Sequence, residues 1–179
     1  MARANHHATY PARFQFIAAM NPCRCGYLGD PDRECSKAPR CGSDYQSKIS
    51  GPMLDRIDIQ VHVPAVSIED LDKTNAESSE IVAKRVKAAR DIQAERFKDH
   101  PISVNAHANG ELLEQEMGLS VSAKELLTKA ATQMRLSARG YYRLIRVSRT
   151  IADLESALGD IQDHHVAEAI SYRSNSLSA

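Results

Sequence analysis

The feature that most constrains this chain is a pair of strand-like segments that enclose a cysteine-rich stretch. Residues 14–20 (FQFIAAM) are almost wholly apolar, and residues 57–63 (IDIQVHV) alternate apolar and polar side chains. A short apolar run is typical of a buried strand, and a period of two is typical of a half-exposed strand. Asn21-Pro22 ends the first segment and Pro64 ends the second, because proline cannot continue a strand ladder. The sequence therefore predicts part of a sheet, with an irregular loop between its two strands.

The second half of the chain changes to helical periodicity. We expect helices at residues 77–98, 110–117, 122–136, 137–158 and 163–172. Ser122 and Ser137 stand where N-caps are expected, and Gly159 stands where the fourth helix is expected to end. The expected organisation is an α/β portion with two strands at residues 1–64, a linker at 65–76, and an all-α domain of four to five helices at 77–179.

Composition limits the location and the partners of the chain. The 23 Lys and Arg residues balance 23 Asp and Glu residues, so nucleic-acid binding would need a local basic patch. No apolar run approaches the roughly 20 residues that a membrane helix needs. The N-terminus also lacks the apolar core of a signal peptide. We therefore expect a cytoplasmic protein with no membrane partner.

Four cysteines crowd into a short part of the loop between the predicted strands. They are Cys23, Cys25, Cys35 and Cys41, spaced C-x-C-x9-C-x5-C. In a chain without an export signal, such a cluster favours a metal site over disulfides. Four thiolates satisfy a tetrahedral Zn²⁺ ion, so a structural zinc site is one interpretation. Reduced thiols in a glycine-rich loop are the alternative, because one residue between Cys23 and Cys25 strains their binding to a single ion.

Two polar residues stand at the ends of the predicted strands. Asn21 follows the apolar segment, where an asparagine can orient a water or bind a phosphate at the edge of a sheet. The alternative is a turn residue before proline, which asparagine suits. Arg56 lies between Asp55 and Asp58, where it is either a salt-bridged surface residue or an arginine finger for a neighbouring subunit's phosphate.

Arginines recur at helical spacing later in the chain. They are Arg135, Arg139, Arg143, Arg146 and Arg149. Like charges three or four residues apart on a helix repel one another, so the pattern favours an anionic partner such as a nucleotide or DNA. A solvated face with acidic neighbours is the alternative.

Three sequence blocks together carry a family resemblance. They are AAMNPCRCGYLGDP, KISGPMLDRIDIQVHVPAV and SARGYYRLIRVSRTIADLE, and they resemble the ComM/YifB group of magnesium-chelatase-related AAA+ ATPases, in the order found in that family. The resemblance implies that residues 1–64 are the C-terminal part of an AAA+ core and residues 77–179 its helical lid. It also implies that the chain starts within the hairpin before sensor 1, near residues 3–10.

The resemblance further implies roles for single residues. Asn21 matches the sensor 1 position, Arg56 the arginine finger and Arg139 sensor 2, with Arg143 as a further nucleotide contact on the same helix. The implied assembly is a hexameric ring that hydrolyses ATP, with Mg²⁺, at subunit interfaces. The implied activity is that of a DNA helicase, which promotes branch migration during natural transformation.

One expected part of an ATPase is missing from this sequence. No G-x-x-x-x-G-K-[ST] loop for phosphates and no Walker B segment occurs in the 179 residues. We therefore interpret the chain as the C-terminal part of a longer protein and expect that it does not hydrolyse ATP alone. The alternatives are a zinc-stabilised DNA-binding module that acts without ATP and the ATPase subunit of a magnesium chelatase.

Overall fold

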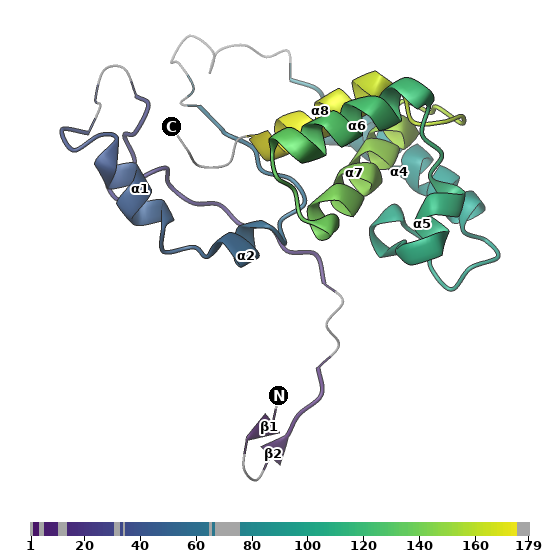
Figure 1. Ribbon diagram of the computed structural model, residues 1–179, viewed down its shortest axis with the longest axis horizontal. Helices are drawn as coiled ribbons and strands as arrows, with labels where there is room; N and C mark the ends of the chain where they lie inside the picture. Colours follow the sequence, from purple (N-terminus) through teal and green to yellow (C-terminus); the bar gives the residue numbers. More distant parts are fainter. Residues whose placement is uncertain are drawn as a thin grey trace. The chain divides into compact units, whose positions relative to one another are not determined.

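The computed structural model describes residues 2–3, 6–10, 14–30, 33, 35–64, 66 and 76–174 (Figure 1). The chain divides into two compact units, Met1–Gln46 and Ser47–Ala179. Residues 47–64, which we expected to belong with the α/β portion, are thus part of the second unit. None of the described helices is long and apolar enough to cross a membrane.

The first unit holds a small hairpin and one helix. Strands β1 (Ala2–Arg3) and β2 (His6–His7) pair antiparallel, with Ala2 opposite His7. Helix α1 (Arg40–Gln46) follows the cysteine-rich loop. The side-chain amide of Gln46 donates a hydrogen bond to the carbonyl of Pro22 at 2.8 Å, which ties the helix to the start of that loop.

The prediction of two strands at residues 14–20 and 57–63 is wrong for this structure. Both segments are described in full, and neither forms a strand. Their apolar side chains lie in solvent, with Ile17 84% and Val63 78% exposed. A strand needs a hydrogen-bonding neighbour, and the described residues offer neither segment such a partner. Instead, a backbone N–H of the second segment, at Gln60, donates to a carbonyl of the last helix at 2.9 Å.

The second unit is a helical domain, as predicted. Its elements are α2 (Gly51–Leu54), α4 (Ser79–Arg96), η1 (Asn105–His107), α5 (Gly110–Glu116), α6 (Val121–Gln133), α7 (Ala138–Leu154) and α8 (Asp163–Ser174). Helix α7 is central, because it packs against α4, α6 and α8 (Figure 1). The core side chains include Phe97, Leu113, Leu127, Leu144, Ile161 and Val166.

Serine side chains cap the start of α6 and α7, and two helix ends differ from the prediction. Ser137 caps α7 as expected, because its hydroxyl accepts a backbone N–H at 3.1 Å. The cap of α6 is Ser120 rather than Ser122, since the Ser120 hydroxyl accepts the N–H three residues later at 3.2 Å. Helix α7 ends at Leu154, earlier than predicted, and Ser156 then takes the left-handed backbone conformation with φ of 60°.

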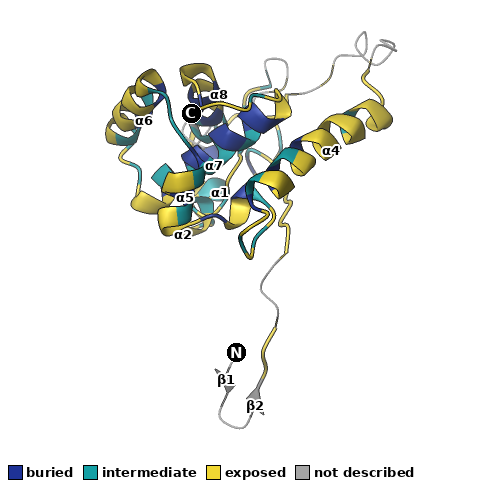
Figure 2. Ribbon diagram, turned by 90° about the vertical axis from the view of Figure 1, so that its right-hand side faces the viewer, coloured by how far each residue is buried: buried dark blue, intermediate teal, exposed yellow. Residues whose placement is uncertain are grey.

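Helix α4 buries only part of the apolar face that its sequence predicts. Ala89 and Phe97, near its C-terminal end, are 4% and 1% exposed. Ile81 and Val86, which lie at helical spacing with Ala89, are 54% and 45% exposed. Figure 2 shows exposed residues along much of this helix. The helix therefore packs against the core through its C-terminal half.

A buried charge network joins α4 to α7. The carboxylate of Asp153 is fully buried and accepts hydrogen bonds from Arg96 at 2.5 and 2.9 Å. It also accepts from Arg149 at 3.1 Å and from the side chain of Asn105 at 2.8 Å. One buried acid thus ties together two helices and the intervening η1 turn, and we expect it to fix how the helices pack.

Candidate nucleotide-sensing site

An open depression on the second unit brings together two predicted site segments. Its lining residues are Gly51, Pro52, Asp55, Ser137, Ala138 and Arg139. The first three belong to α2 and its C-cap, directly before Arg56, and the others start α7. The loop of the predicted arginine finger and the predicted sensor 2 residue therefore border one surface, although about eighty residues of sequence separate them.

The guanidinium of Arg56 is open to solvent. The residue is exposed, and within the described part of the chain its guanidinium makes one long hydrogen bond, of 3.4 Å, to the carbonyl of Pro52. The neighbouring acids Asp55 and Asp58 pair with other arginines, so Arg56 is not the salt-bridged residue that one interpretation predicted. Its side chain is therefore available to an anion outside this unit.

Asp55 instead holds the loop of residues 55–58 against the helices of the second unit. Its carboxylate accepts hydrogen bonds from the Ser137 hydroxyl at 3.0 Å and from Arg173 at 2.9 Å. Its backbone carbonyl accepts a hydrogen bond from Arg143, and Asp58 forms an ion pair with the same guanidinium at 3.2 Å. The loop is thus held by side chains of α7 and α8.

The two arginines predicted to contact nucleotide differ in how they are held. Arg139 is exposed and makes no hydrogen bond or ion pair with the part of the chain that the structure describes. Arg143 is half-buried, and its guanidinium is already engaged by the loop of Asp55. Arg139 is therefore accessible to a phosphate as it stands, whereas Arg143 must give up contacts to reach one.

The predicted stripe of exposed arginines is wrong for the C-terminal part of α7. Arg146 donates to two backbone carbonyls of the η1 segment at 3.2 and 3.3 Å. Arg149 is 3% exposed and binds Asp153. Burial lowers the pKa of both guanidinium groups. Only Arg135 and Arg139 remain exposed, because the inner face of α7 points into the core.

The four cysteines lie in the first unit as free thiols, and no three of their sulfur atoms lie within 4.8 Å of one another. The sulfur atoms of Cys23 and Cys25 lie 3.1 Å apart. Burial opposes ionisation of Cys23, but the hydrogen bonds from Cys25 and nearby backbone groups lower its pKa to about 7. The hydrogen bond to Cys35 raises the pKa of Cys41 to about 12. A thiolate is the form that binds metal, and the four sulfur atoms would have to draw closer to share one Zn²⁺ ion.

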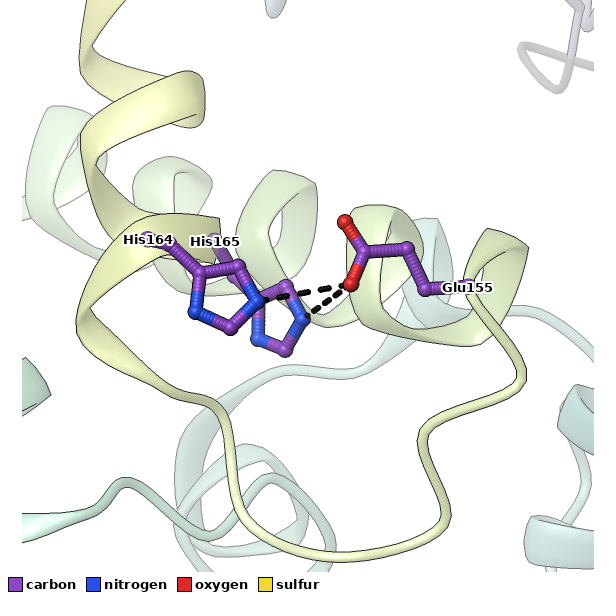
Figure 3. Close-up of side chains that lie close together, drawn as sticks. All are labelled: Glu155, His164 and His165. Atoms are coloured by element: carbon purple, nitrogen blue, oxygen red, sulfur yellow. Dashed lines mark hydrogen bonds and ion pairs between the residues drawn. The ribbon is translucent and has the colours of Figure 1, made fainter.

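A second cluster of candidate ligands was missed at the level of sequence. Glu155, His164 and His165 form the one group of three such residues, in the described part of the chain, whose ligand atoms all lie within 4.8 Å (Figure 3). The Glu155 carboxylate lies 3.0 Å from Nε2 of His165 and 3.4 Å from Nε2 of His164. In the sequence, only the adjacent histidines suggested a site. Glu155 lies nine residues earlier, and the loop after α7 brings it next to them.

The hydrogen bonds of this cluster favour a capping role over a metal ion. The backbone N–H of Gln162 donates to Nδ1 of His165 at 2.9 Å. The proton of the neutral ring therefore sits on Nε2, which then donates to Glu155. The hydrogen bond from His165 lowers the pKa of Glu155, although burial opposes it. Because a metal would need the Nε2 lone pair, the arrangement holds the start of α8 instead.

Comparison with known proteins identifies the family. Residues 76–173 match the family described as magnesium chelatase, subunit ChlI C-terminal. The chain belongs to this family. Residues 1–71 match the companion family described as magnesium chelatase, subunit ChlI. The boundary between the two matched regions lies near the linker that the sequence predicted at residues 65–76.

Individual relatives of the ChlI family support the more specific resemblance. The competence protein ComM of Haemophilus influenzae is 38% identical over 176 residues. The uncharacterized proteins YifB of Salmonella typhimurium and YifB of Escherichia coli are 37% and 35% identical over 175 residues. Each match covers 97% of this chain and 33% of the relative. The resemblance to the ComM/YifB group is confirmed, and the chain spans about a third of the length of these relatives.

Three of the predicted site residues lie at exposed positions of the described structure. Arg56 and Arg139 are both exposed residues of the second unit, close to one depression. Asn21 is an exposed residue of the first unit, directly after the extended segment 14–20. Its role as sensor 1, and the roles of the arginines, stay predictions.

Proposed function

We propose that this chain is the C-terminal portion of a ring-forming AAA+ ATPase of the ChlI family. In the complete protein it supplies Asn21 as sensor 1, Arg56 as the arginine finger and Arg139 as sensor 2. ATP and Mg²⁺ are bound by the complete protein, at sites shared between adjacent subunits of a hexamer. The observation that carries the proposal is the exposed guanidinium of Arg56. The acids on either side of it, Asp55 and Asp58, pair with Arg173 and Arg143 instead, so neither neutralises Arg56.

The chemistry of phosphoryl transfer explains why such an arginine is useful. Charge builds on the oxygens around the γ-phosphate as the bond to it breaks, and a guanidinium placed there stabilises that charge. An arginine that is held tightly within its own subunit cannot serve this purpose in the next one. Hydrogen bonds of Asp55 hold the backbone next to Arg56 in place, whereas the Arg56 guanidinium itself is exposed to solvent.

The proposed substrate of the complete protein is DNA. The resemblance to the ComM/YifB group implies a helicase that promotes branch migration, and one relative is named a competence protein. The charge of this chain is balanced, so any part that it contributes to DNA binding must be a local basic surface. A magnesium chelatase ATPase subunit remains the alternative within the same family.

The isolated 179-residue chain is expected to show neither ATP binding nor ATP hydrolysis, whereas the full-length protein shows both. The reason is that sensors and fingers respond to a triphosphate, while a phosphate-binding loop must hold it. Phosphate release and a fluorescent ATP analogue measure the two properties in parallel. Hydrolysis by the isolated chain, or its absence from a full-length ring supplied with DNA, would contradict the proposal.

A second candidate function rests on the four cysteines. We infer that Cys23, Cys25, Cys35 and Cys41 bind one Zn²⁺ ion, and that the chain is a zinc-stabilised helical module that binds DNA without ATP. The expected result is one zinc per chain by elemental analysis, which is lost when all four residues are replaced by serine. DNA affinity should then fall steeply with salt and disappear with the zinc.

The outcome separates the two functions. Stoichiometric zinc together with tight, salt-dependent binding by the isolated chain favours the independent module. If the chain binds stoichiometric zinc but no DNA, the zinc is a structural ion of the ATPase. Less than one zinc in ten chains, under reducing conditions, overturns the metal site and leaves four reduced thiols.

A further inference from the structure

We propose that Asp55 is a positioning residue that couples the arginine-finger loop to the lid of its own subunit. This inference rests on the proposed ATPase function. Asp55 joins Ser137 at the start of α7 and Arg173 near the end of α8. Because Arg56 follows Asp55 directly, a shift of the lid is transmitted to the guanidinium that faces the next subunit.

The contacts of Asp55 use both oxygens of its carboxylate. Oδ1 accepts from Nη2 of Arg173 at 2.9 Å, and Oδ2 accepts from the Ser137 hydroxyl at 3.0 Å. The backbone carbonyl accepts a third hydrogen bond, from Arg143. A carboxylate held by charge-assisted and neutral hydrogen bonds from two helices has little freedom to turn. The base of the finger is therefore fixed in relation to α7 and α8.

Burial makes the pair with Arg173 more than a surface salt bridge. The Arg173 side chain is 9% exposed, and that of Asp55 is 34% exposed. Nη1 of Arg173 is buried and lacks a hydrogen-bond partner in the described structure. Asp55 is thus the acid that compensates this charge, and losing it would leave a buried guanidinium without a counter-ion.

Ser137 links the same contact to the predicted sensor. Its hydroxyl accepts the backbone N–H of Gly140 at 3.1 Å as the N-cap of α7, and it donates its proton to Asp55. Arg139 lies in the first turn of that helix. A phosphate that draws Arg139 toward it moves the start of α7, and the Ser137–Asp55 bond carries the movement to Arg56. Coupling of this kind is reciprocal between the two sites.

The test is Asp55→Asn in the full-length ring, with turnover and nucleotide affinity measured separately. We expect kcat to fall on the order of 10- to 100-fold, the loss typical of a catalytic group displaced by about 1 Å, while the KM for ATP stays within about twofold. Cooperativity between ATP sites should also be lost. Arg173→Lys retains the charge but not the planar fork and should give a smaller loss of the same kind.

A matched control removes an acid–arginine pair elsewhere. Glu77 pairs with Arg85 on the exposed part of the lid at 2.8 and 3.0 Å, so Glu77→Gln should leave kcat and cooperativity unchanged. If Asp55→Asn prevents ring assembly, the same measurements are made on Arg173→Lys. If the assembled variant has normal kcat and cooperativity and Arg56→Ala is inactive, the coupling is wrong and the proposed function stands. Full turnover by Arg56→Ala would instead overturn the proposed function, and the coupling with it.

Discussion

Replacing Arg56 with alanine in the full-length protein is expected to lower ATP turnover by about 10³–10⁵-fold, the range observed for arginine fingers. Nucleotide binding should be retained, because the guanidinium acts mainly on charge that develops in the transition state. The exposed position of the side chain, with one long hydrogen bond to Pro52, means that its loss costs the lid little stability. Steady-state phosphate release and equilibrium nucleotide titration measure the two effects.

Rings that mix Arg56→Ala and unmodified subunits test directly whether the arginine acts on a neighbouring subunit. If the finger acts on a neighbour, an Arg56→Ala subunit should regain activity at its own ATP site when an unmodified subunit donates the arginine to it. Arg90→Ala provides the matched control, since Arg90 is an exposed arginine of α4 away from the depression. Unchanged turnover in the Arg56→Ala homomeric ring would remove the finger assignment.

Replacing Asp153 with alanine is expected to destabilise the helical unit by about 3–5 kcal/mol, the cost of removing one partner of a buried ion pair. The carboxylate is fully buried and binds Arg96, Arg149 and Asn105. Its removal leaves two guanidinium groups, 12% and 3% exposed, without their common counter-ion. Since domains are stable by only about 5–15 kcal/mol, the loss should be visible in thermal and urea unfolding.

The control for this prediction is another aspartate paired with a basic residue four positions away. Asp91 binds Lys87 at 2.6 Å on the surface of α4, where both side chains are more than half exposed. Asp91→Ala should cost less than about 1 kcal/mol, because water and salt screen exposed pairs. If the two variants had equal unfolding midpoints, burial would not determine how much the Asp153 network contributes to stability.

The helical unit was largely predictable because its signals are local. Apolar spacing located α4, α5, α6, α7 and α8, and Ser137 was identified as a cap from its position before the helix. The two strands failed for the opposite reason. Periodicity shows that a segment can form a strand, but only a neighbouring strand supplies the hydrogen bonds, and no described residue does so here.

The candidate site was predictable in its residue types but not in its contacts. The motif LDRID and the resemblance pointed to Arg56, and spacing pointed to the arginines of α7. Nothing in the sequence showed that Asp55 meets Ser137 and Arg173, which are 82 and 118 residues further along the chain. The same limitation affected the arginine stripe, because burial against the η1 segment depends on how the helices pack.

The partly uncovered helix α4 has a consequence for the order of the lid. A short stretch of helix without packing is marginally stable in water, so its first turns depend on side chains of the helix itself. Ion pairs such as Glu77–Arg85 and Glu80–Lys84 supply that support at the surface. Dissolved salt weakens such pairs but hardly affects the apolar contacts of Phe97. Fraying should therefore begin at the N-terminal end of α4 and grow with ionic strength, while the other end stays intact.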